Sequence, residues 1–525
     1  MFGGLSLVGQ EQVDLRTVDR MKTESFERSQ VMDHLYYLSE VHGPRLTGSP
    51  QYERAAHWAV ERLKSFGLTN VHLEKWGPFG RSWSLEQSSV ELVKPNYQAL
   101  TAAPLAWCKS SNGPVTGEPV LAPFKANFRM GPKKMREQFE EYQKAWTGKL
   151  RGRIVLISNL DVLKPQTNPQ FRRYTDADLA QMSAAPLPAT KVKAKKLEDL
   201  EWPEDAEDVG KFFGSLPNDL MEQVYDLYDE LAATRGEFFA REGVSAVLLA
   251  DGRAHEGMLF AEAAAGFKSS RQLAPPTFVV TAEQYDRLVR SVQRKTPVTL
   301  RVNLKVNVSD KDVDGLNIIG EIPGGSKKDE VVMIGAHFDS WHTGTGTTDN
   351  GAGSAVMIEV MRILKSLDLK MDRTVRIGLW GGEEEGLLGS RAYVKEHFAN
   401  PETTNISGYF NLDNGSGKIR GVYLQGNDAM RPLFEKWLAP FRDQGVTTVS
   451  IRNTGGTDHL SFDAIGLPGF QFIQDPLDYS TVTHHSDLDV YDHAVPEDLM
   501  QAAAVIANCV YQAANRPEML PRRPR

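Results

Sequence analysis

The stretch "VVMIGAHFDSWHTGTGTTDNGAG" (Val331 to Gly353) decides the fold of this chain. It begins as an apolar run typical of a buried strand and passes directly into a segment rich in glycine, histidine and aspartate. His337 and Asp339 end the strand, and as residues i and i+2 of an extended chain they point to the same side. Asp349 follows in the glycine-rich loop, just before a segment with helical spacing of apolar residues. The stretch therefore predicts a strand, a loop carrying polar side chains, and a helix.

The same order of elements recurs through the second half of the chain. From about Asn317 onward, apolar strands such as "TVRIGLW", "GYFNLD" and "PGFQFIQ" alternate with amphipathic helices, the last from about Glu497. Strands that alternate with helices favour a parallel sheet covered on both faces. We therefore expect an α/β fold with a mixed, largely parallel sheet and helices on both faces.

The first half of the chain predicts a second, smaller unit. A helical pattern from about Glu27 to Phe66 is broken by "GPRLTGSP" (residues 43–50), and "NVHLEKW" then alternates as a strand does. Between about 104 and 300 the sequence pattern changes. This region has proline-rich loops, the predicted strands "RGRIVLIS" and "VSAVLLAD", and a predicted helix over about 219–242. We expect residues 20–103 and 301–515 to form one main domain, and residues 104–300 to form an inserted α/β domain that shapes access to a site. The charged segment over 189–208 reads as a solvated linker.

Composition limits the classes of protein to which the chain can belong. At 525 residues it is too long for one ordinary core. The net charge of −8, from 60 basic and 68 acidic residues, argues against nucleic acid as a partner. Cys108 and Cys509 stand far apart without a C-x-x-C motif, so no thiolate metal site is expected. No run of eighteen apolar residues predicts a membrane span, and the short apolar patch near the start is either the tail of a signal peptide or a frayed terminus.

Acidic and histidine side chains follow four predicted strands, where sites of open α/β sheets form. Each has an ordinary explanation when taken alone; Asp349, for example, could cap a helix. Together they would concentrate negative charge at one rim unless cations lie there. Histidine and carboxylate donors without a thiolate suit one or two zinc ions, with cobalt or manganese as substitutes. The side chains beyond the opening stretch are Glu383, Glu384, Glu385, Asp413, His484 and His485.

Five segments, "AHFDSWHTGTGTTDNGAG", "GGEEEGLLGS", "NLD", "GGTDHLSF" and "THHSDLDV", resemble the motifs of the co-catalytic zinc exopeptidases of the M28 family. The resemblance is closest to the carboxypeptidase Q-like branch and covers about residues 25–90 and 310–515, including "GPRLTG". It implies the zinc exopeptidase fold for the main domain, which would be catalytic. The segment over 104–300 resembles the protease-associated domain inserted in many of these enzymes.

The resemblance also implies a role for each matching residue. His337 and Asp413 would bind one zinc ion, Glu384 and His485 a second, and Asp349 would bridge the two. His485 is preferred to His484 because "HSDLD" reproduces the spacing of the family, although the choice between these neighbours stays open. The remaining assignments are Glu383 as general base, Asp339 as the partner that orients His337, and Trp341, His342, Asp458, His459 and His484 as candidates for the substrate pocket.

The implied reaction is hydrolysis of peptide bonds near the terminus of short peptides. An aminopeptidase is the first hypothesis, and a carboxypeptidase or dipeptidase of the carboxypeptidase Q type is the alternative. A glutaminyl cyclase shares the fold but resembles a one-zinc site, and receptor-like relatives without activity lose ligands. The complete set of ligand types in this sequence argues against both. The resemblance further implies a secreted or periplasmic protein and leaves a homodimer open.

Overall fold

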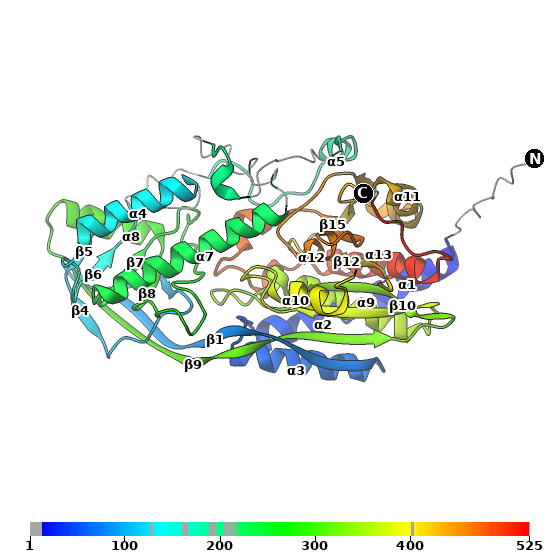
Figure 1. The fold of residues 1–525 in the computed structure, drawn as a ribbon, viewed down its shortest axis with the longest axis horizontal. Coiled ribbons are helices and arrows are strands. Elements are labelled where there is room, and N and C mark those ends of the chain that lie inside the picture. Colours follow the sequence, from blue (N-terminus) through cyan, green and yellow to red (C-terminus); the bar gives the residue numbers. More distant parts are fainter. Residues whose placement is uncertain are drawn as a thin grey trace, which may run out of the picture.

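The computed structural model describes residues 13–126, 130–159, 166–187, 196–203, 212, 216, 218–400 and 404–523. These residues form two sheets at opposite ends of an elongated molecule (Figure 1). The first twelve residues and most of the predicted linker over 189–208 lie outside the described residues. No helix in the described part of the chain is both long enough and apolar enough to cross a bilayer.

The larger sheet is mixed, and its central strands are parallel, as the sequence predicts. Its order is β14-β13-β15-β12-β10-β11-β9-β1-β2, in which β2 spans Gln98–Leu100, with β4 pairing on β9. The pairs β11–β10, β10–β12 and β12–β15 are parallel, whereas β9 runs antiparallel to β11. The central and outer strands span Lys327–His337 (β10), Arg373–Trp380 (β11), Ile406–Asn411 (β12), Gly469–Gln474 (β15), Ile419–Tyr423 (β13) and Thr448–Ser450 (β14).

Helices cover both faces of this sheet. Val332 and Ile334 of β10 lie in one buried core with residues of six α-helices, one of which is α11 (Arg431–Leu438), whereas Val331 and Met333, which point to the other face, lie in a second core. The central helix of the first face is buried from Ala352 to Leu364, because other helices cover the side that faces away from the sheet. The first face carries α1 (Leu15–Glu27), α2 (Val31–Tyr36), α3 (Pro50–Ser65), α9 (Ala352–Ser366) and α13 (Pro496–Asn515), and the second carries α10 (Leu388–His397) and α12 (His459–Asp463).

The smaller sheet lies in the region expected to be inserted. Its order is β3-β8-β7-β6-β5, in which β5, β6, β7 and β8 are parallel. The predicted limits of 104 and 300 stay predictions, and β4 (Val115–Gly117), which falls between them, pairs with β9 of the larger sheet. The elements are β3 (Ala102–Pro104), β5 (Pro119–Leu121), β6 (Ile154–Leu156), β7 (Ala246–Leu249), β8 (Thr277–Val280), α4 (Pro132–Trp146), α5 (Asp176–Ser183), α7 (Asn218–Arg241) and α8 (Ala282–Gln293).

A long two-stranded ribbon joins the two sheets. β1 (Thr69–Lys94) and β9 (Thr299–Ile322) pair antiparallel over their whole length, with several register shifts (Figure 1). The far end of the ribbon continues towards the smaller sheet, so the chain leaves and re-enters the larger sheet through one paired element. The sequence predicts only the first part of β1, as "NVHLEKW".

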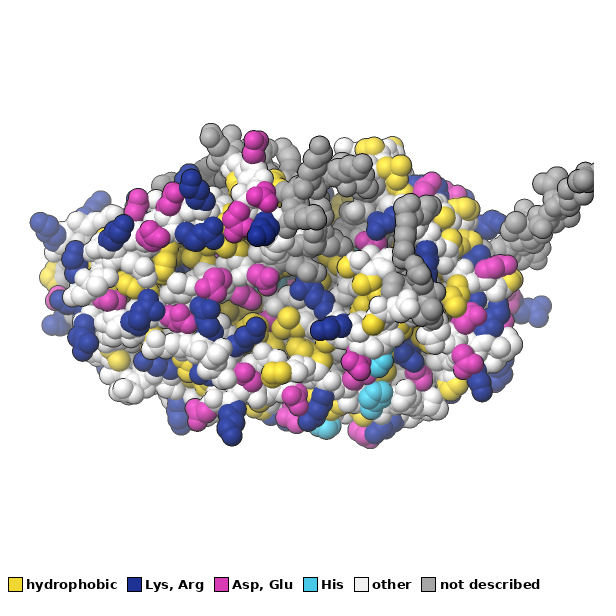
Figure 2. Space-filling view, viewed as in Figure 1, with side chains coloured by type: hydrophobic (Ala, Val, Ile, Leu, Met, Phe, Trp, Pro, Cys, Tyr) yellow, Lys and Arg dark blue, Asp and Glu magenta, His cyan; other side chains and the backbone are white. Residues whose placement is uncertain are grey.

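Charged side chains of both signs are interspersed on the visible face of both parts (Figure 2). Dark blue and magenta side chains alternate there, so that face carries no broad basic surface. A nucleic-acid-binding face typically gathers Lys and Arg on one side.

Candidate metal centre

Three neighbouring strands bring the predicted ligands to one edge of the larger sheet. His337 is the last residue of β10 and pairs in register with Trp380, the last residue of β11. Glu383 and Glu384 follow β11 after a short turn, and Asp413 follows β12. Because the strands are parallel, their carboxyl ends meet at this edge.

Asp349 lies between two groups of donors. Its Oδ1 is 3.2 Å from Nε2 of His337, and its Oδ2 is 3.3 Å from Nε2 of His485. On the first side, Asp413 Oδ1 is 3.7 Å from the same nitrogen of His337. On the second side, Glu384 Oε2 is 3.0 Å from Nε2 of His485. The five predicted ligands therefore form two groups that share one carboxylate.

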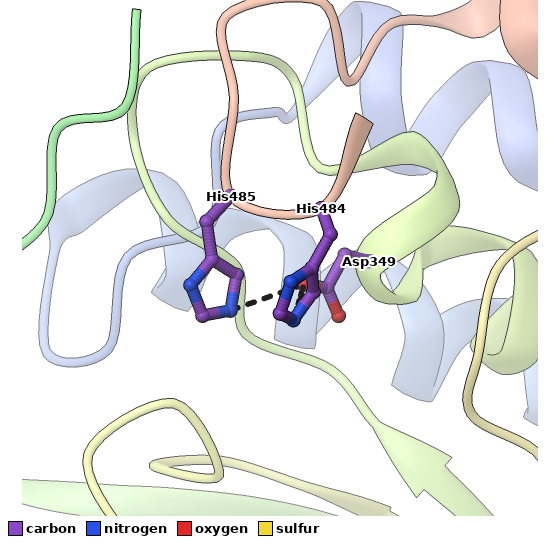
Figure 3. A group of neighbouring side chains, drawn as sticks. All are labelled: Asp349, His484 and His485. Carbon is purple, nitrogen blue, oxygen red and sulfur yellow. Dashed lines mark ion pairs between the residues drawn. The ribbon is translucent and has the colours of Figure 1, made fainter. Parts of the chain in front are cut away.

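His484 lies beside this arrangement. Its Nε2 is 3.8 Å from Asp349 Oδ2, its ring lies 3.9 Å from the ring of His485, and both histidines point towards the aspartate (Figure 3). The side chain of His484 is 44% exposed, against 20% for His485. Of the two histidines, His485 is the one that contacts Glu384 among the described residues, and its Nδ1 also forms a hydrogen bond with Glu262 at 3.0 Å. These contacts favour His485 as the ligand.

The glycines of the loop allow a close approach between chain segments. Gly346 has a φ of +67°, and a Cβ there would lie 2.3 Å from Ser340. A Cβ on Gly353 would lie 2.3 Å from the carbonyl oxygen of Leu412, next to Asp413. Side chains at these positions would push the loop, and with it Asp349, away from the strand ends.

Asp339 has contacts of the kind expected for a residue that orients a ligand. Its Oδ1 is 3.5 Å from His337 Nδ1, and the same nitrogen is 3.1 Å from the backbone oxygen of Asp339. Its Oδ2 accepts hydrogen bonds from Thr47 Oγ1 at 2.8 Å and from the backbone N–H of Glu384 at 3.3 Å. One carboxylate therefore contacts a predicted ligand from each of two strands.

The segment "GPRLTG" supports the same edge from the N-terminal part of the chain. Thr47 accepts a hydrogen bond from the backbone N–H of Gly382, just before the acidic triplet. Arg45 is fully buried and donates to the carbonyl oxygens of Phe338 and Gly346, at 2.7 and 2.8 Å. Burial lowers the pKa of Arg45 to about 10, opposed by the acidic side chains near it. This segment thus fixes the backbone on both sides of the loop.

The edge holds more negative charge than the protein neutralises. Burial, and then the charge of Asp349, raise the pKa of Glu384 to about 7. Burial also raises the pKa of Glu383 well above its usual range. The charge of His337 lowers this pKa, whereas the charges of Asp413 and Asp458 raise it further. Asp413 Oδ1 and Glu384 Oε1 are buried and find no hydrogen-bond partner among the described residues. Two histidines with three carboxylates at these distances fit zinc, which accepts nitrogen and oxygen donors.

The candidates for the substrate pocket divide into two groups. Trp341 lines a small cleft together with Asp349, Glu384 and His485, and its ring is 6.1 Å from that of His485. His342 instead contacts the side of the smaller sheet, with Nε2 2.8 Å from the carbonyl oxygen of Pro104.

The other candidates lie around α12. His459 is fully buried, and its Nε2 is 2.9 Å from Nε2 of Gln425 and 3.2 Å from the Thr454 carbonyl oxygen. Asp458 is also fully buried, and burial raises its pKa to about 7. The charge of Asp458 contributes to the raised pKa of Glu383, the predicted base.

Sequence reasoning missed three residues that support the centre. Thr47 lies in a quoted motif without an assigned role. Asp489, in "HSDLDV", accepts from the backbone N–H groups of Thr348 and Asp349, at 2.5 and 3.2 Å, and holds the loop of the shared carboxylate. Glu262 reaches His485 from the inserted region, which was expected to contribute only to access. The acidic and basic residues directly after "VSAVLL" were the available signal for this region.

Comparisons with known proteins find peptidases that are similar to this chain. A family model described as peptidase family M28 matches residues 317–510. Carboxypeptidase Q of Bos taurus is 24% identical over 515 residues, covering 98% of this chain and 90% of its own. Aminopeptidase YwaD of Bacillus subtilis is 28% identical over 232 residues, covering 43% of this chain and 50% of its own.

Solved structures share the fold over nearly the whole chain. A peptidase M28 precursor from Shewanella amazonensis has a TM-score of 0.66 at 23% identity, covering 97% of this chain and 98% of its own. A zinc aminopeptidase from Bacillus subtilis has a TM-score of 0.54 at 20% identity, covering 93% and 95%. The predicted fold class is therefore confirmed.

Proposed function

The chain belongs to peptidase family M28 through residues 317–510, and from that premise we propose that it is an exopeptidase that hydrolyses short peptides with two zinc ions. The observation that carries the proposal is the position of Asp349, whose two oxygens face two different histidines. A carboxylate placed in this way can bridge two metal ions. Cobalt and manganese are expected to substitute, because the donors are nitrogen and oxygen only.

Five side chains would hold the metals. His337 and Asp413 would bind one zinc ion, Glu384 and His485 the other, and Asp349 both. Zinc, when bound, would polarise the scissile carbonyl group and lower the pKa of a water molecule. Asp339 would hold His337 with Nε2 towards the metal, since it lies near Nδ1 on the opposite side of the ring.

Glu383 is the proposed general base. It would take a proton from the attacking water and pass it to the nitrogen of the leaving amine. Burial raises the pKa of Glu383, so its carboxylate is a stronger base than an exposed glutamate. His337, Asp413 and Asp458 all act on its charge, which agrees with a position between the metal ligands and the α12 side of the centre.

The end of the peptide that is attacked divides two candidate functions. We propose an aminopeptidase first, and the similarity to the YwaD aminopeptidase, 28% identical over 232 residues, supports this proposal. A carboxypeptidase or dipeptidase is the second candidate. It is favoured by the extent of similarity, since carboxypeptidase Q matches 98% of this chain and the YwaD aminopeptidase matches 43%.

A panel of short peptides with blocked termini tests both candidates. Zinc-loaded protein is incubated with free, N-acetylated and C-amidated dipeptides and tripeptides. An aminopeptidase loses activity only when the amine is blocked, a carboxypeptidase only when the carboxylate is blocked, and a dipeptidase in both cases. The proposal fails if folded protein with two zinc ions cleaves none of the unblocked peptides.

The resemblance supports two further proposals about the protein in its cell. We propose a secreted or periplasmic location, which fractionation of the native host would test. A homodimer is the proposed assembly, and light scattering of the purified full chain would decide between one and two copies.

A further inference from the structure

We propose that Glu262, on the inserted unit, is a positioning residue that holds the imidazole of His485 in the orientation required for zinc binding. This inference rests on the proposed metal centre and adds a contribution from outside the catalytic part of the chain. Glu262 Oε1 is 3.0 Å from Nδ1 of His485, and the two residues are 223 positions apart. The inserted unit therefore acts directly on a predicted ligand as well as lying beside the centre.

The hydrogen bond determines which nitrogen faces the metal. A carboxylate can only accept, so Nδ1 of His485 must carry the proton and donate it to Glu262. The lone pair of the neutral ring is then on Nε2. That nitrogen lies 3.3 Å from Asp349 Oδ2 and 3.0 Å from Glu384 Oε2, among the donors of the second zinc ion. A partner on the outer nitrogen commonly fixes the tautomer and rotation of a metal-binding histidine.

The backbone of His485 explains why support from outside its own loop matters. Its backbone φ is +62°, in the left-handed region that residues other than glycine seldom adopt. Such a conformation persists where surrounding contacts hold it. The inserted unit provides contacts on the residues that follow: Phe260 forms a β-bridge with Ser486, and the N–H of Leu259 donates to Asp487 Oδ1 at 2.8 Å.

Glu262 is itself held by a charge arrangement within the inserted unit. Arg253 Nη2 is 2.9 Å from Glu262 Oε1. Arg253 in turn binds Asp251 through two contacts, at 2.9 and 3.0 Å, and lies over the ring of Phe260 at 4.5 Å. A paired guanidinium of this kind has little freedom to rotate. The carboxylate of Glu262 is thus placed before any metal binds.

The test measures zinc affinity of the full chain by competition with a chelator. Glu262→Ala removes the acceptor, and we expect the dissociation constant of the zinc ion held by Glu384 and His485 to rise 10–100-fold. Glu262→Gln keeps the size and an acceptor but loses the charge, so a smaller rise of about threefold to tenfold is expected. Glu256→Gln is the matched control on the same unit, since Glu256 is exposed and its described side-chain contacts are with His255 and Gln170.

Two outcomes would overturn the proposal. The first is Glu262→Ala protein that binds both zinc ions with wild-type affinity. The second outcome applies if the Glu262→Ala protein does not fold. In that case, the proposal is overturned if the Glu262→Gln protein keeps the wild-type zinc affinity and the wild-type ¹⁵N signal of His485 Nδ1. Zinc affinity does not depend on peptide hydrolysis, so wild-type protein that binds two zinc ions but cleaves no peptide would refute the proposed function and leave this test valid.

Discussion

Both sheets have charged side chains in the segments that follow their parallel strands. The two sets differ in whether the protein supplies a cationic partner for the carboxylates. On the larger sheet, Asp413 and Glu384 each have a buried oxygen with no hydrogen-bond partner among the described residues. On the smaller sheet, Asp251 and Glu262 share the guanidinium of Arg253. The first edge leaves buried acidic oxygens for cations from outside the chain, whereas on the second both carboxylates are paired with a cation of the chain itself. Unbalanced buried charge, more than acidity, distinguishes the metal centre from its support.

The largest expected effect comes from the proton acceptor of the larger sheet. Glu383→Gln keeps size and hydrogen bonding but cannot take a proton, so kcat should fall by about 10²–10⁴-fold. The zinc content should stay at two, because Glu383 is not a proposed ligand. Steady-state kinetics at saturating zinc and elemental analysis measure the two quantities.

Glu256→Gln, the same change on an exposed residue of the inserted unit, should leave kcat unchanged. If Glu383→Gln keeps full activity and Glu384→Gln is inactive with both metals bound, the roles of these neighbours are exchanged.

The second prediction contrasts an acid of each edge in metal binding. Asp349→Asn removes the charge shared by both groups of donors, so zinc affinity should fall by about 10–100-fold or more. At zinc concentrations that saturate wild-type protein, elemental analysis should return fewer than two equivalents per chain. Asp251→Asn should return more zinc than Asp349→Asn, because Asp251 acts on His485 only through Arg253 and Glu262. Two equivalents in Asp349→Asn protein at low free zinc would argue against a bridging carboxylate.

The third prediction concerns the support of the larger edge from the N-terminal segment. Thr47→Val removes the donor to Asp339 and the acceptor for the Gly382 N–H, and leaves both groups buried. The free energy of unfolding should fall by about 1–3 kcal/mol in zinc-free protein. Denaturant titration measures the loss, and Thr116→Val on an exposed position of β4 is the control, expected within about 0.5 kcal/mol of wild type. Equal stability of both variants would show that the Thr47 contacts contribute little.

The smallest expected effect is a pH dependence of zinc-free protein. Burial lowers the pKa of His459 from 6.5 to about 4, so the unfolded chain binds this proton more readily than the folded one. The contribution of His459 to stability is complete above pH 6.5 and is lost as the pH falls towards 4. Between pH 7.5 and 5 the loss is about 2 kcal/mol, and His459→Gln should remove it from the pH profile. His57→Gln, at an exposed position, should keep the wild-type profile.

The sequence predicted the features that depend on neighbours in the chain. Strands such as "VVMIGAHFD" and "TVRIGLW" are short, apolar and followed by polar residues, and the larger sheet places them as expected. The grouping of ligands followed from the rule that parallel strands end at one edge. The roles of His337, Asp349 and Glu384 stay predictions, for which the distances among them are the support.

The features that were missed depend on contacts between distant parts of the chain. β1 was predicted only in part, because exposed residues and register shifts interrupt its alternation. Glu262 itself gave no signal beyond the charged residues that follow "VSAVLL", since its partner His485 is 223 residues away and a single glutamate is usually solvated. Thr47 is likewise an ordinary residue in sequence, and only its contacts with Asp339 and Gly382 give it a role.

The β1–β9 ribbon has a consequence for exchange of parts between related enzymes. Because the outgoing and returning strands are paired with each other, the chain between them leaves and re-enters at one place, and cutting it out at the ribbon would leave the larger sheet continuous. The course of the chain would therefore allow a module from another protein to be inserted at the ribbon. The loop that carries the predicted ligand His485, however, contacts one particular segment of the inserted unit, the segment that carries Glu262. Recombination at the ribbon should therefore give chimeras that fold, but the loop around His485 and the inserted module must be exchanged together.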